Sequence, residues 1–162
     1  MRSGPGSDRE SARGAACIRE AGPDPIMSDG GGPICLAVHA AIADRRGRLL
    51  VLRRPWTSDY NPERWELPGG RLNRGEGIRE ALVREVLEET GLKVVPGRLL
   101  GAGNQERTEG RVVHLVLAVT DSAGELTLSD EHDAHRWITP NGLSRLPLSD
   151  WMAAWVTGLR GG

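Results

Sequence analysis

The 162-residue chain has no excess of charge and little cysteine, and both shortages exclude classes of protein. Lys and Arg total 21 and Asp and Glu total 22, so the formal net charge is −1 and no global field attracts a long nucleic acid or an anionic membrane. Cys17 lies in a tail-like segment and Cys35 opens an apolar run, which does not favour a disulfide framework or a zinc site. We therefore expect a reducing, cytoplasmic location.

Long apolar runs and aromatic side chains are also scarce. No stretch approaches the roughly 20 apolar residues that span a bilayer, and the N-terminus has no apolar core of signal-peptide length. We expect neither a membrane span nor export. Aromatic residues make up 4% of the chain, so we expect Trp137, Trp151 and Trp155 to fill the interior rather than to stack on a ligand.

Two segments of different composition divide the chain. Residues 1–32 are rich in Gly, Ser, Arg and Asp and follow no helical or strand period, so we predict a disordered N-terminal tail. Met27 is an alternative start of translation. Residues 33–162 have the length of one domain.

The spacing of apolar residues predicts an α/β domain. Strands are expected at 34–43, 49–52, 65–67, 93–100, 111–120, 126–128 and 134–138, and helices at 77–90 and 149–159, with a short helical turn after Pro140. The turn residues at 44–47 predict that the first two strands form a hairpin. Gly91 lies where a glycine cap ends the first long helix.

The segment from Gly70 to Leu92 carries the clearest indication of chemistry. It reads Gly70-Arg-Leu-Asn-Arg-Gly-Glu76 and, after seven residues, Arg84-Glu85-Val86-Leu87-Glu88-Glu89-Thr90-Gly91-Leu92. At about 100° per residue, Glu85, Glu88 and Glu89 share one arc of the helix, and a different arc, able to pack on a sheet, holds Leu82, Val83, Val86 and Leu87. Three adjacent carboxylates repel one another unless a cation lies between them, and Mg²⁺ binds such oxygen donors together with phosphate oxygens. The alternative is a solvated helix face supported by pairs such as Glu80 with Arg84.

The whole segment resembles the signature of the Nudix hydrolase family, of the MutT-like kind, at every defined position. Residues 65–70, Trp-Glu-Leu-Pro-Gly-Gly, are similar to the strand and glycine turn that enter the Nudix box, and the resemblance spans about residues 33–160. It implies a Nudix-type α/β/α sandwich with a mixed central sheet. It also implies a hydrolase in which water attacks a phosphorus of a nucleoside diphosphate linked to another group.

The resemblance also implies roles for residues in and beyond the box. Glu85, Glu88 and Glu89 would bind Mg²⁺, with Mn²⁺ as a substitute, and the carbonyl of Gly70 would be a further ligand. Arg84 would orient the glutamates by ion pairing. Glu76 is either a peripheral metal contact or a structural partner, and it also lies at the start of the helix, where the dipole favours a carboxylate.

A loop glutamate before a Trp-containing strand serves many Nudix enzymes as a metal ligand or general base. Glu131 resembles it in its spacing to Trp137, and Asp130 and Asp133 are its rivals. The alternative is that all three carboxylates only solvate a turn. His132 and His135 do not have the spacing of a zinc site.

Four residues outside the box are candidates for binding substrate: Arg54, Glu66, Arg111 and Asp150. Each has a structural alternative: Arg54 as a solvated strand-end charge, Glu66 and Arg111 as satisfied structural groups, and Asp150, or Ser149 before it, as the cap of the last helix. His114 lies in the same region as Arg111.

A small nucleotide is the expected substrate, most simply a (deoxy)nucleoside triphosphate. ADP-ribose or a nucleotide sugar is the alternative within the enzyme class. A third hypothesis is a domain that only senses nucleotides, which the complete set of box glutamates disfavours. We expect no long nucleic acid as a partner, and both a monomer and a homodimer remain open.

Overall fold

The computed structural model describes residues 33–108 and 110–159, so the predicted tail at 1–32 lies outside the described residues. Within them, a four-stranded sheet has the order β4-β1-β6-β5 and a three-stranded sheet has the order β3-β2-β7. Strand bounds are Ile34–Ala41 for β1, Leu49–Arg53 for β2, Trp65–Glu66 for β3, Gly69–Arg71 for β4, Lys93–Arg107 for β5, Gly110–Ala123 for β6 and Ala134–Ile138 for β7. Helix bounds are Ile78–Thr90 for α2, Pro140–Arg145 for the 3₁₀ helix η1 and Asp150–Gly158 for α3.

The four-stranded sheet is mixed. β1 pairs in parallel with β6 and antiparallel with β4, and β5 pairs antiparallel with β6. β1 is apolar at almost every position, and Ala37, Val38 and Ala40 are at most 3% exposed, as expected for a strand covered on both faces. The mixed sheet predicted from the sequence is confirmed.

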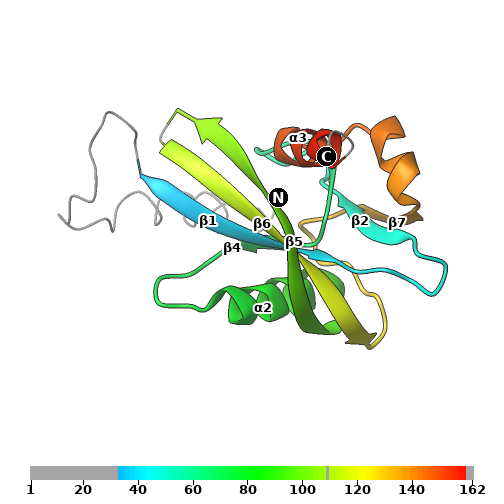
Figure 1. The fold of residues 1–162 in the computed structure, drawn as a ribbon. Helices are drawn as coiled ribbons and strands as arrows, with labels where there is room; N and C mark the ends of the chain where they lie inside the picture. Colours follow the sequence, from blue (N-terminus) through cyan, green and yellow to red (C-terminus); the bar gives the residue numbers. More distant parts are fainter. Residues whose placement is uncertain (1–32, 109, 160–162) are drawn as a thin grey trace, which may run out of the picture.

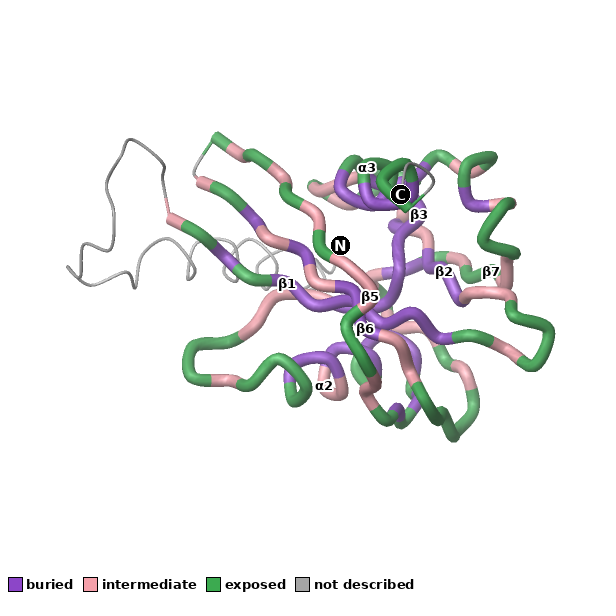
Figure 2. The backbone as a smooth tube through the Cα atoms, in the orientation of Figure 1, coloured by how far each residue is buried: buried purple, intermediate pink, exposed green. Residues whose placement is uncertain are grey.

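Helices cover both faces of the strands (Figure 1). On one side, α2 packs Leu82 and Val86 against β1, β2 and β6. On the other, α3 packs Trp151 and Met152 against Val51 and other strand residues. Figure 2 shows the buried backbone concentrated between these helical layers. The α/β/α sandwich is confirmed.

Four local predictions are wrong or incomplete. The predicted hairpin is present only next to its turn, where the Asp44 N–H donates to the Arg48 carbonyl and the Leu50 N–H donates to the Ile42 carbonyl, whereas β1 and β2 themselves belong to different sheets. Residues 126–128 form no strand, since the backbone N–H of Thr127 donates to the end of α2 at Thr90 instead. β4 was missed because its three residues include two glycines, and β5 continues beyond residue 100 because β6 pairs with it as far as Arg107.

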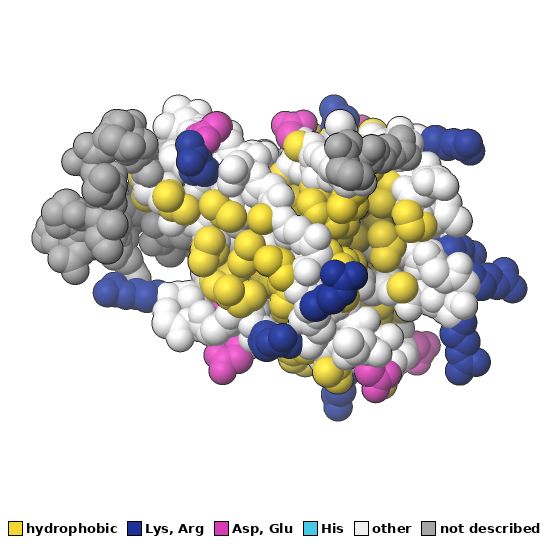
Figure 3. Space-filling model, viewed as in Figure 1, with side chains coloured by type: hydrophobic (Ala, Val, Ile, Leu, Met, Phe, Trp, Pro, Cys, Tyr) yellow, Lys and Arg dark blue, Asp and Glu magenta, His cyan; other side chains and the backbone are white. Residues whose placement is uncertain are grey.

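The surface and the cysteine add two observations. Figure 3 shows apolar side chains over the middle of the molecule, and Val95 and Leu99 of the edge strand β5 are 53% and 55% exposed. Cys35 is disulfide-bonded, although the positions of the two cysteines in the sequence did not favour a disulfide framework. In the described part of the chain, no helix is long and apolar enough to cross a membrane.

Candidate active site

The helix α2 sets the position of the box glutamates. It begins after Gly77, whose backbone N–H donates to the Glu80 carboxylate at 3.1 Å, and it ends at Gly91 in the left-handed conformation with φ of 70°. Glu85 and Glu89 lie one turn apart and are 5% and 3% exposed. The helix therefore directs two carboxylates into the interior, on the side of β4.

Two glycines of β4 allow this close approach. A Cβ atom on Gly69, whose φ is 146°, would lie 2.1 Å from the Val38 carbonyl oxygen. A Cβ on Gly70 would lie 2.6 to 2.8 Å from the carboxyl atoms of Glu85. At Gly69 only glycine fits, because the backbone of the neighbouring strand fills the space, whereas a larger residue at Gly70 would displace the Glu85 carboxylate.

Glu89 is held by the backbone of the same strand. The N–H of Gly69 donates to Glu89 Oε2 at 2.8 Å. Burial raises the pKa of Glu89 well above its usual range, and the neighbouring charges of Glu85 and Glu66 raise it further. The hydrogen bond from Gly69 and the charge of Arg54 oppose this effect without cancelling it. This carboxylate therefore lacks countercharge in the metal-free protein.

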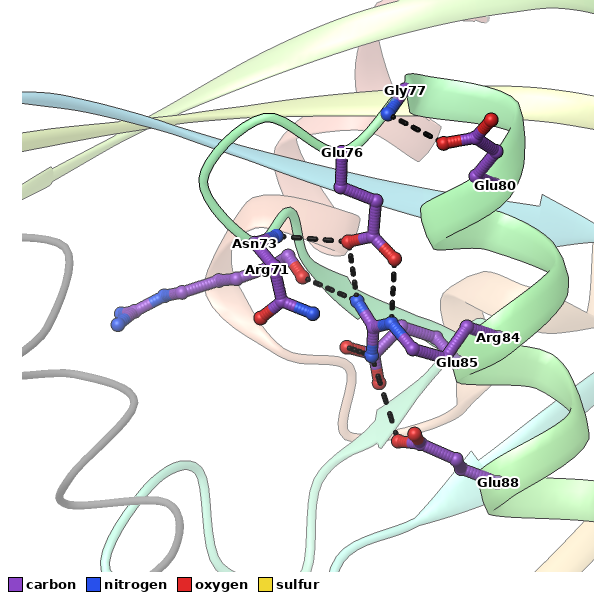
Figure 4. Close-up of polar contacts among 8 residues, drawn as sticks. All are labelled: Arg71, Asn73, Glu76, Gly77, Glu80, Arg84, Glu85 and Glu88. Atoms are coloured by element: carbon purple, nitrogen blue, oxygen red, sulfur yellow. Dashed lines mark hydrogen bonds and ion pairs between the residues drawn. The ribbon is translucent and has the colours of Figure 1, made fainter.

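Arg84 joins three glutamates of the box. Its guanidinium donates to both oxygens of Glu76 at 2.7 and 2.8 Å and to Glu85 at 2.7 Å, and lies 3.5 Å from Glu88 (Figure 4). It also donates to the carbonyl of Arg71 at 3.2 Å. These hydrogen bonds raise the pKa of Arg84 and lower that of Glu76. Arg84 thus ties the loop before α2 to the helix face that carries the box glutamates.

The box carboxylates do not share one environment. The Glu88 side chain is 46% exposed, so it lies at the edge of the group rather than beside Glu89. Leu87, expected to pack on the sheet, is 44% exposed. The buried face of α2 instead includes Glu85 and Glu89, an arrangement that a purely apolar periodicity does not predict.

Arg54 and Glu66 form a buried ion pair beside the carboxylates. Arg54 Nε donates to Glu66 Oε1 at 2.5 Å, and the indole N–H of Trp151 lies 3.5 Å from Glu66 Oε2. Both charged residues are less than 9% exposed. The structure therefore brings together two of the predicted substrate-binding residues, as a buried pair whose charges act on Glu89.

The loop 129–133 is attached to the end of α2. The backbone N–H of Ser129 donates to the Glu89 carbonyl at 3.0 Å, and Asp133 accepts two hydrogen bonds from Arg53 at 2.8 and 3.0 Å. His132 is 4% exposed, and burial together with Arg54 lowers its pKa to about 3. Glu131 is partly buried beside it. The loop carrying Glu131 is thus hydrogen-bonded to the end of the helix that carries the box.

The remaining two candidates lie at the surface. Arg111 is exposed and donates to Glu106 across the β5–β6 ladder at 2.5 Å. Asp150 is the exposed first residue of α3, and Ser149 occupies the cap position without a side-chain cap hydrogen bond. Neither residue is joined to the carboxylates by a contact that the structure describes.

Sequence reasoning missed a group of polar side chains next to the Arg54–Glu66 pair, formed by His39, Tyr60, Gln105 and Arg107. Tyr60 comes from the loop after β2, and Gln105 and Arg107 lie on β5. Alternation along β5 could have placed Gln105 and Arg107 on one face. No pattern in the sequence could have placed Tyr60 beside them.

The donors present suit a hard divalent cation. Glu85, Glu89 and the Gly70 carbonyl offer oxygen ligands only, and the desolvated Glu89 carboxylate gains most from added positive charge. Among the described residues, no three His, Cys, Asp or Glu side chains are gathered as a ready metal site.

Comparisons with known proteins agree with this geometry. The family model of the NUDIX domain matches residues 33–159. The chain is 37% identical over 115 residues to the CTP pyrophosphohydrolase of Escherichia coli (strain K12), covering 70% of this chain and 83% of that protein. It is 31% identical over 120 residues to the ADP-ribose pyrophosphatase of Methanocaldococcus jannaschii, covering 68% and 69%. The solved structure of the MutT protein from Methanosarcina mazei Go1 matches with a TM-score of 0.73 and 33% identity, over 80% of this chain and 94% of that one.

Proposed function

The chain belongs to the NUDIX domain family, and we propose that within it this protein hydrolyses a (deoxy)nucleoside triphosphate or related small nucleotide, releasing pyrophosphate. It is an enzyme that acts on acid anhydrides, and Nudix hydrolases generally require a divalent metal. Mg²⁺ is the metal that we propose, with Mn²⁺ as a substitute, because oxygen donors alone are present.

One observation carries the proposal: two buried carboxylates held against a glycine backbone. Glu89 accepts from Gly69, and the Glu85 carboxylate occupies the space beside Gly70 where any other residue would place its side chain. Arg84 donates to Glu85, but burying the Glu89 carboxylate beside it costs folding free energy unless a further cation compensates its charge. A solvated helix face would need neither the burial nor the glycines.

The proposed roles of the chain's own residues follow from these contacts. Glu85, Glu89 and the Gly70 carbonyl would hold the cation, which would polarise a phosphoryl group and make water more acidic. Arg84 positions Glu85 through its hydrogen bond at 2.7 Å. In the reaction, a water oxygen bonds to phosphorus, a P–O bond of the anhydride breaks, and a base accepts the proton. Glu88 and Glu131 are the candidates for that base.

ADP-ribose is the second candidate substrate, favoured by the relative named as an ADP-ribose pyrophosphatase. Its hydrolysis would use the same carboxylates and would yield AMP and ribose 5-phosphate. The greater identity and coverage of the relative named as a CTP pyrophosphohydrolase favour the nucleoside triphosphate.

A substrate panel tests the proposal. Purified protein is incubated with the common nucleoside and deoxynucleoside triphosphates, ADP-ribose, a nucleotide sugar and a dinucleotide, with Mg²⁺, with Mn²⁺ and with EDTA. We expect metal-dependent formation of a nucleoside monophosphate and pyrophosphate from at least one triphosphate. Metal-dependent cleavage of ADP-ribose alone would move the assignment to the second candidate. No cleavage of any compound would contradict the proposal.

A further inference from the structure

A chain of polar side chains runs from the interior to the surface beside the ion pair of Arg54 and Glu66. His39 Nε2 lies 2.9 Å from His114 Nδ1, and His114 Nε2 lies 3.3 Å from Gln105 Oε1. The Tyr60 hydroxyl donates to the same Gln105 oxygen at 3.0 Å. We call these four residues the recognition network. His39 and His114 are each 4% exposed, whereas Tyr60 and Gln105 are only partly buried.

With the Gln105 carboxamide oxygen as the acceptor at both of its contacts, the hydrogen bonds of the recognition network run in one direction. Burial lowers the pKa of both imidazoles, that of His114 to about 4, so each ring is neutral and carries one N–H near neutral pH. If His114 Nε2–H donates to Gln105, then His114 Nδ1 must accept from His39 Nε2–H. Both contacts of the Gln105 carboxamide are thus made by its oxygen, and its NH₂ group lies at the other end, where it can donate to a ligand.

Arg107 adds further donors on the same face of β5. Gln105 and Arg107 are two residues apart on the strand, so their side chains lie on one face. The Arg107 guanidinium lies 4.6 Å from the centre of the Tyr60 ring, which holds it beside the recognition network. A guanidinium has no acceptor atom. Because the Gln105 oxygen is engaged by Tyr60 and His114, the groups that Gln105 and Arg107 have left for a ligand are hydrogen-bond donors.

Packing against α3 shows where this face lies. A Cβ on Gly101 would lie 2.9 Å from the Trp155 indole nitrogen, and one on Gly103 would lie 3.7 Å from the Trp151 carbonyl. The row Gly101, Gly103, Gln105 thus runs along α3 toward its first turn.

The network is also joined to the catalytic side of the molecule. The Arg54 guanidinium lies 5.2 Å from the centre of the Tyr60 ring, and its partner Glu66 is one of the charges that act on Glu89. A ligand held at Gln105 would thus be connected to the carboxylates through packed side chains.

From this geometry we propose that Gln105 and Arg107 determine substrate specificity by donating hydrogen bonds to a nucleobase edge with two adjacent acceptors. Cytosine offers O2 and N3, and guanine offers O6 and N7. In adenine, the ring nitrogens N1 and N7 each lie next to the amino group, which is a donor. In uracil, the N3–H donor lies between the two carbonyl oxygens. Neither of these edges therefore offers two adjacent acceptors. The inference rests on the proposed nucleotide hydrolase and adds the class of base that it selects.

Metal-free binding tests base selection independently of hydrolysis. CTP, GTP, ATP and UTP are titrated in EDTA into the wild type, Gln105→Glu and the control Asn104→Asp, which makes the same change on the opposite, exposed face of β5. We expect the wild type to bind CTP or GTP about tenfold more tightly than ATP or UTP, the size of one or two net hydrogen bonds. Gln105→Glu should reduce that ratio to about threefold or less, and Asn104→Asp should keep it. An equal affinity of the wild type for all four, or an unchanged ratio in Gln105→Glu, would overturn the inference.

Tyr60→Phe provides a second, milder variant. It removes the hydroxyl that orients the Gln105 carboxamide while keeping the ring between Arg54 and Arg107. With the triphosphate that the enzyme cleaves best, we expect KM to rise several-fold at nearly unchanged kcat, because the carboxylates are untouched; an unchanged KM would contradict the role of Tyr60. If the wild type binds CTP or GTP more tightly than ATP or UTP in EDTA yet cleaves no triphosphate with Mg²⁺, the proposed hydrolase function is wrong. The inference of base recognition by Gln105 and Arg107 is then kept.

Discussion

The burial of Glu89 suits metal binding but lowers the stability of the fold. Its burial beside Glu85 and Glu66 raises its pKa, so the folded protein binds this proton more tightly than the unfolded chain. Its contribution to stability is full below the unfolded pKa and is lost as pH rises through the folded pKa. In the absence of metal, Glu89 therefore makes the fold less stable as pH rises above the pKa of the unfolded chain.

The first prediction follows from that sign. In EDTA, Glu89→Gln should gain stability relative to the wild type as pH rises from about 5 to about 7.5, because only the wild type pays for ionisation. Urea unfolding of both proteins across that range measures the difference. A difference in unfolding free energy that does not change with pH would mean that Glu89 titrates normally.

Gly70 gives the second prediction. Gly70→Ala would place a methyl group within 2.6 to 2.8 Å of the Glu85 carboxyl atoms, so the carboxylate must move. We expect kcat to fall by at least about tenfold, since small misplacements of catalytic groups are costly, and half-maximal activity to require more Mg²⁺. Gly75→Ala is the control, because Gly75 has open space for a Cβ although its φ of 76° is strained. Equal activity of Gly70→Ala and the wild type would exclude the close approach of Glu85.

Residues of the site differ in how far the sequence reveals them. The spacing of Glu85 and Glu89 on one helix is a local property, so it predicts their shared face. The burial of these two and the exposure of Glu88 depend on where β4 lies, which local spacing does not contain. Tyr60 and Gln105 are 45 residues apart and meet only in the folded chain.

At the scale of an element, the loop 129–133 presents three carboxylates with different surroundings. Asp133 is engaged in two hydrogen bonds with Arg53, Asp130 is exposed, and Glu131 is partly buried. An anchored loop next to the end of α2 can present a base or ligand to the carboxylates from a direction that the helix itself cannot reach. Glu131 therefore remains our candidate, and its role is a prediction.

The third prediction compares Glu131→Gln with Asp130→Asn and Asp133→Asn. Loss of a general base costs about 10²- to 10⁴-fold in kcat, so Glu131→Gln should lose activity on that scale and the two aspartate variants should stay within a few-fold. Excess Mg²⁺ should partly restore activity if Glu131 is a ligand and should not if it is the base. Full activity of all three variants would mean that the three carboxylates only solvate the loop. A loss of activity in one aspartate variant alone would assign the role of base or ligand to that aspartate.

Strand pairing shows where element prediction from sequence stops. The strands β1 and β2 were predicted correctly, but the predicted hairpin between them extends only from Ile42 to Leu50 and does not continue along β1. Val38 pairs with Gly70 and Leu115 instead, so both edges of β1 are taken by strands from later in the chain. The parallel neighbour β6 begins about 70 residues later, and a local turn rule cannot weigh such a partner against the adjacent strand.

For the whole molecule, three buried histidines make stability depend on pH. Burial is the main cause that lowers the pKa of His39, of His114 to about 4 and of His132 to about 3. Each binds its proton more readily when unfolded, so its contribution to stability is full above the unfolded pKa of about 6.5 and is lost as pH falls toward the folded value. Glu89 acts in the opposite sense over part of the same range.

The fourth prediction is tested in the Glu89→Gln variant, in which Glu89 no longer opposes the pH dependence that the histidines cause. Its unfolding free energy should fall as pH drops from about 7 to about 5, by about 2 kcal/mol for each of His114 and His132. Adding His114→Gln should reduce the slope of the unfolding free energy against pH by about the contribution of one titrating proton. Urea unfolding at several pH values measures this slope. A slope that His114→Gln leaves unchanged would mean that this imidazole titrates normally in the fold.

The metal-dependent hydrolysis of the triphosphate that the wild type cleaves best, compared among the wild type, Glu89→Gln and Glu80→Gln, tests the central claim most directly. Glu80→Gln makes the same change on the same helix, at an exposed residue whose carboxylate only caps Gly77. The account predicts pyrophosphate release by the wild type with Mg²⁺, at least about a 10²-fold lower kcat for Glu89→Gln, equal to roughly 3 kcal/mol of barrier, and near-normal activity for Glu80→Gln. Circular dichroism should show that both variants are folded. Turnover of folded Glu89→Gln within a few-fold of the wild type would contradict the claim that the buried carboxylates form the catalytic metal site.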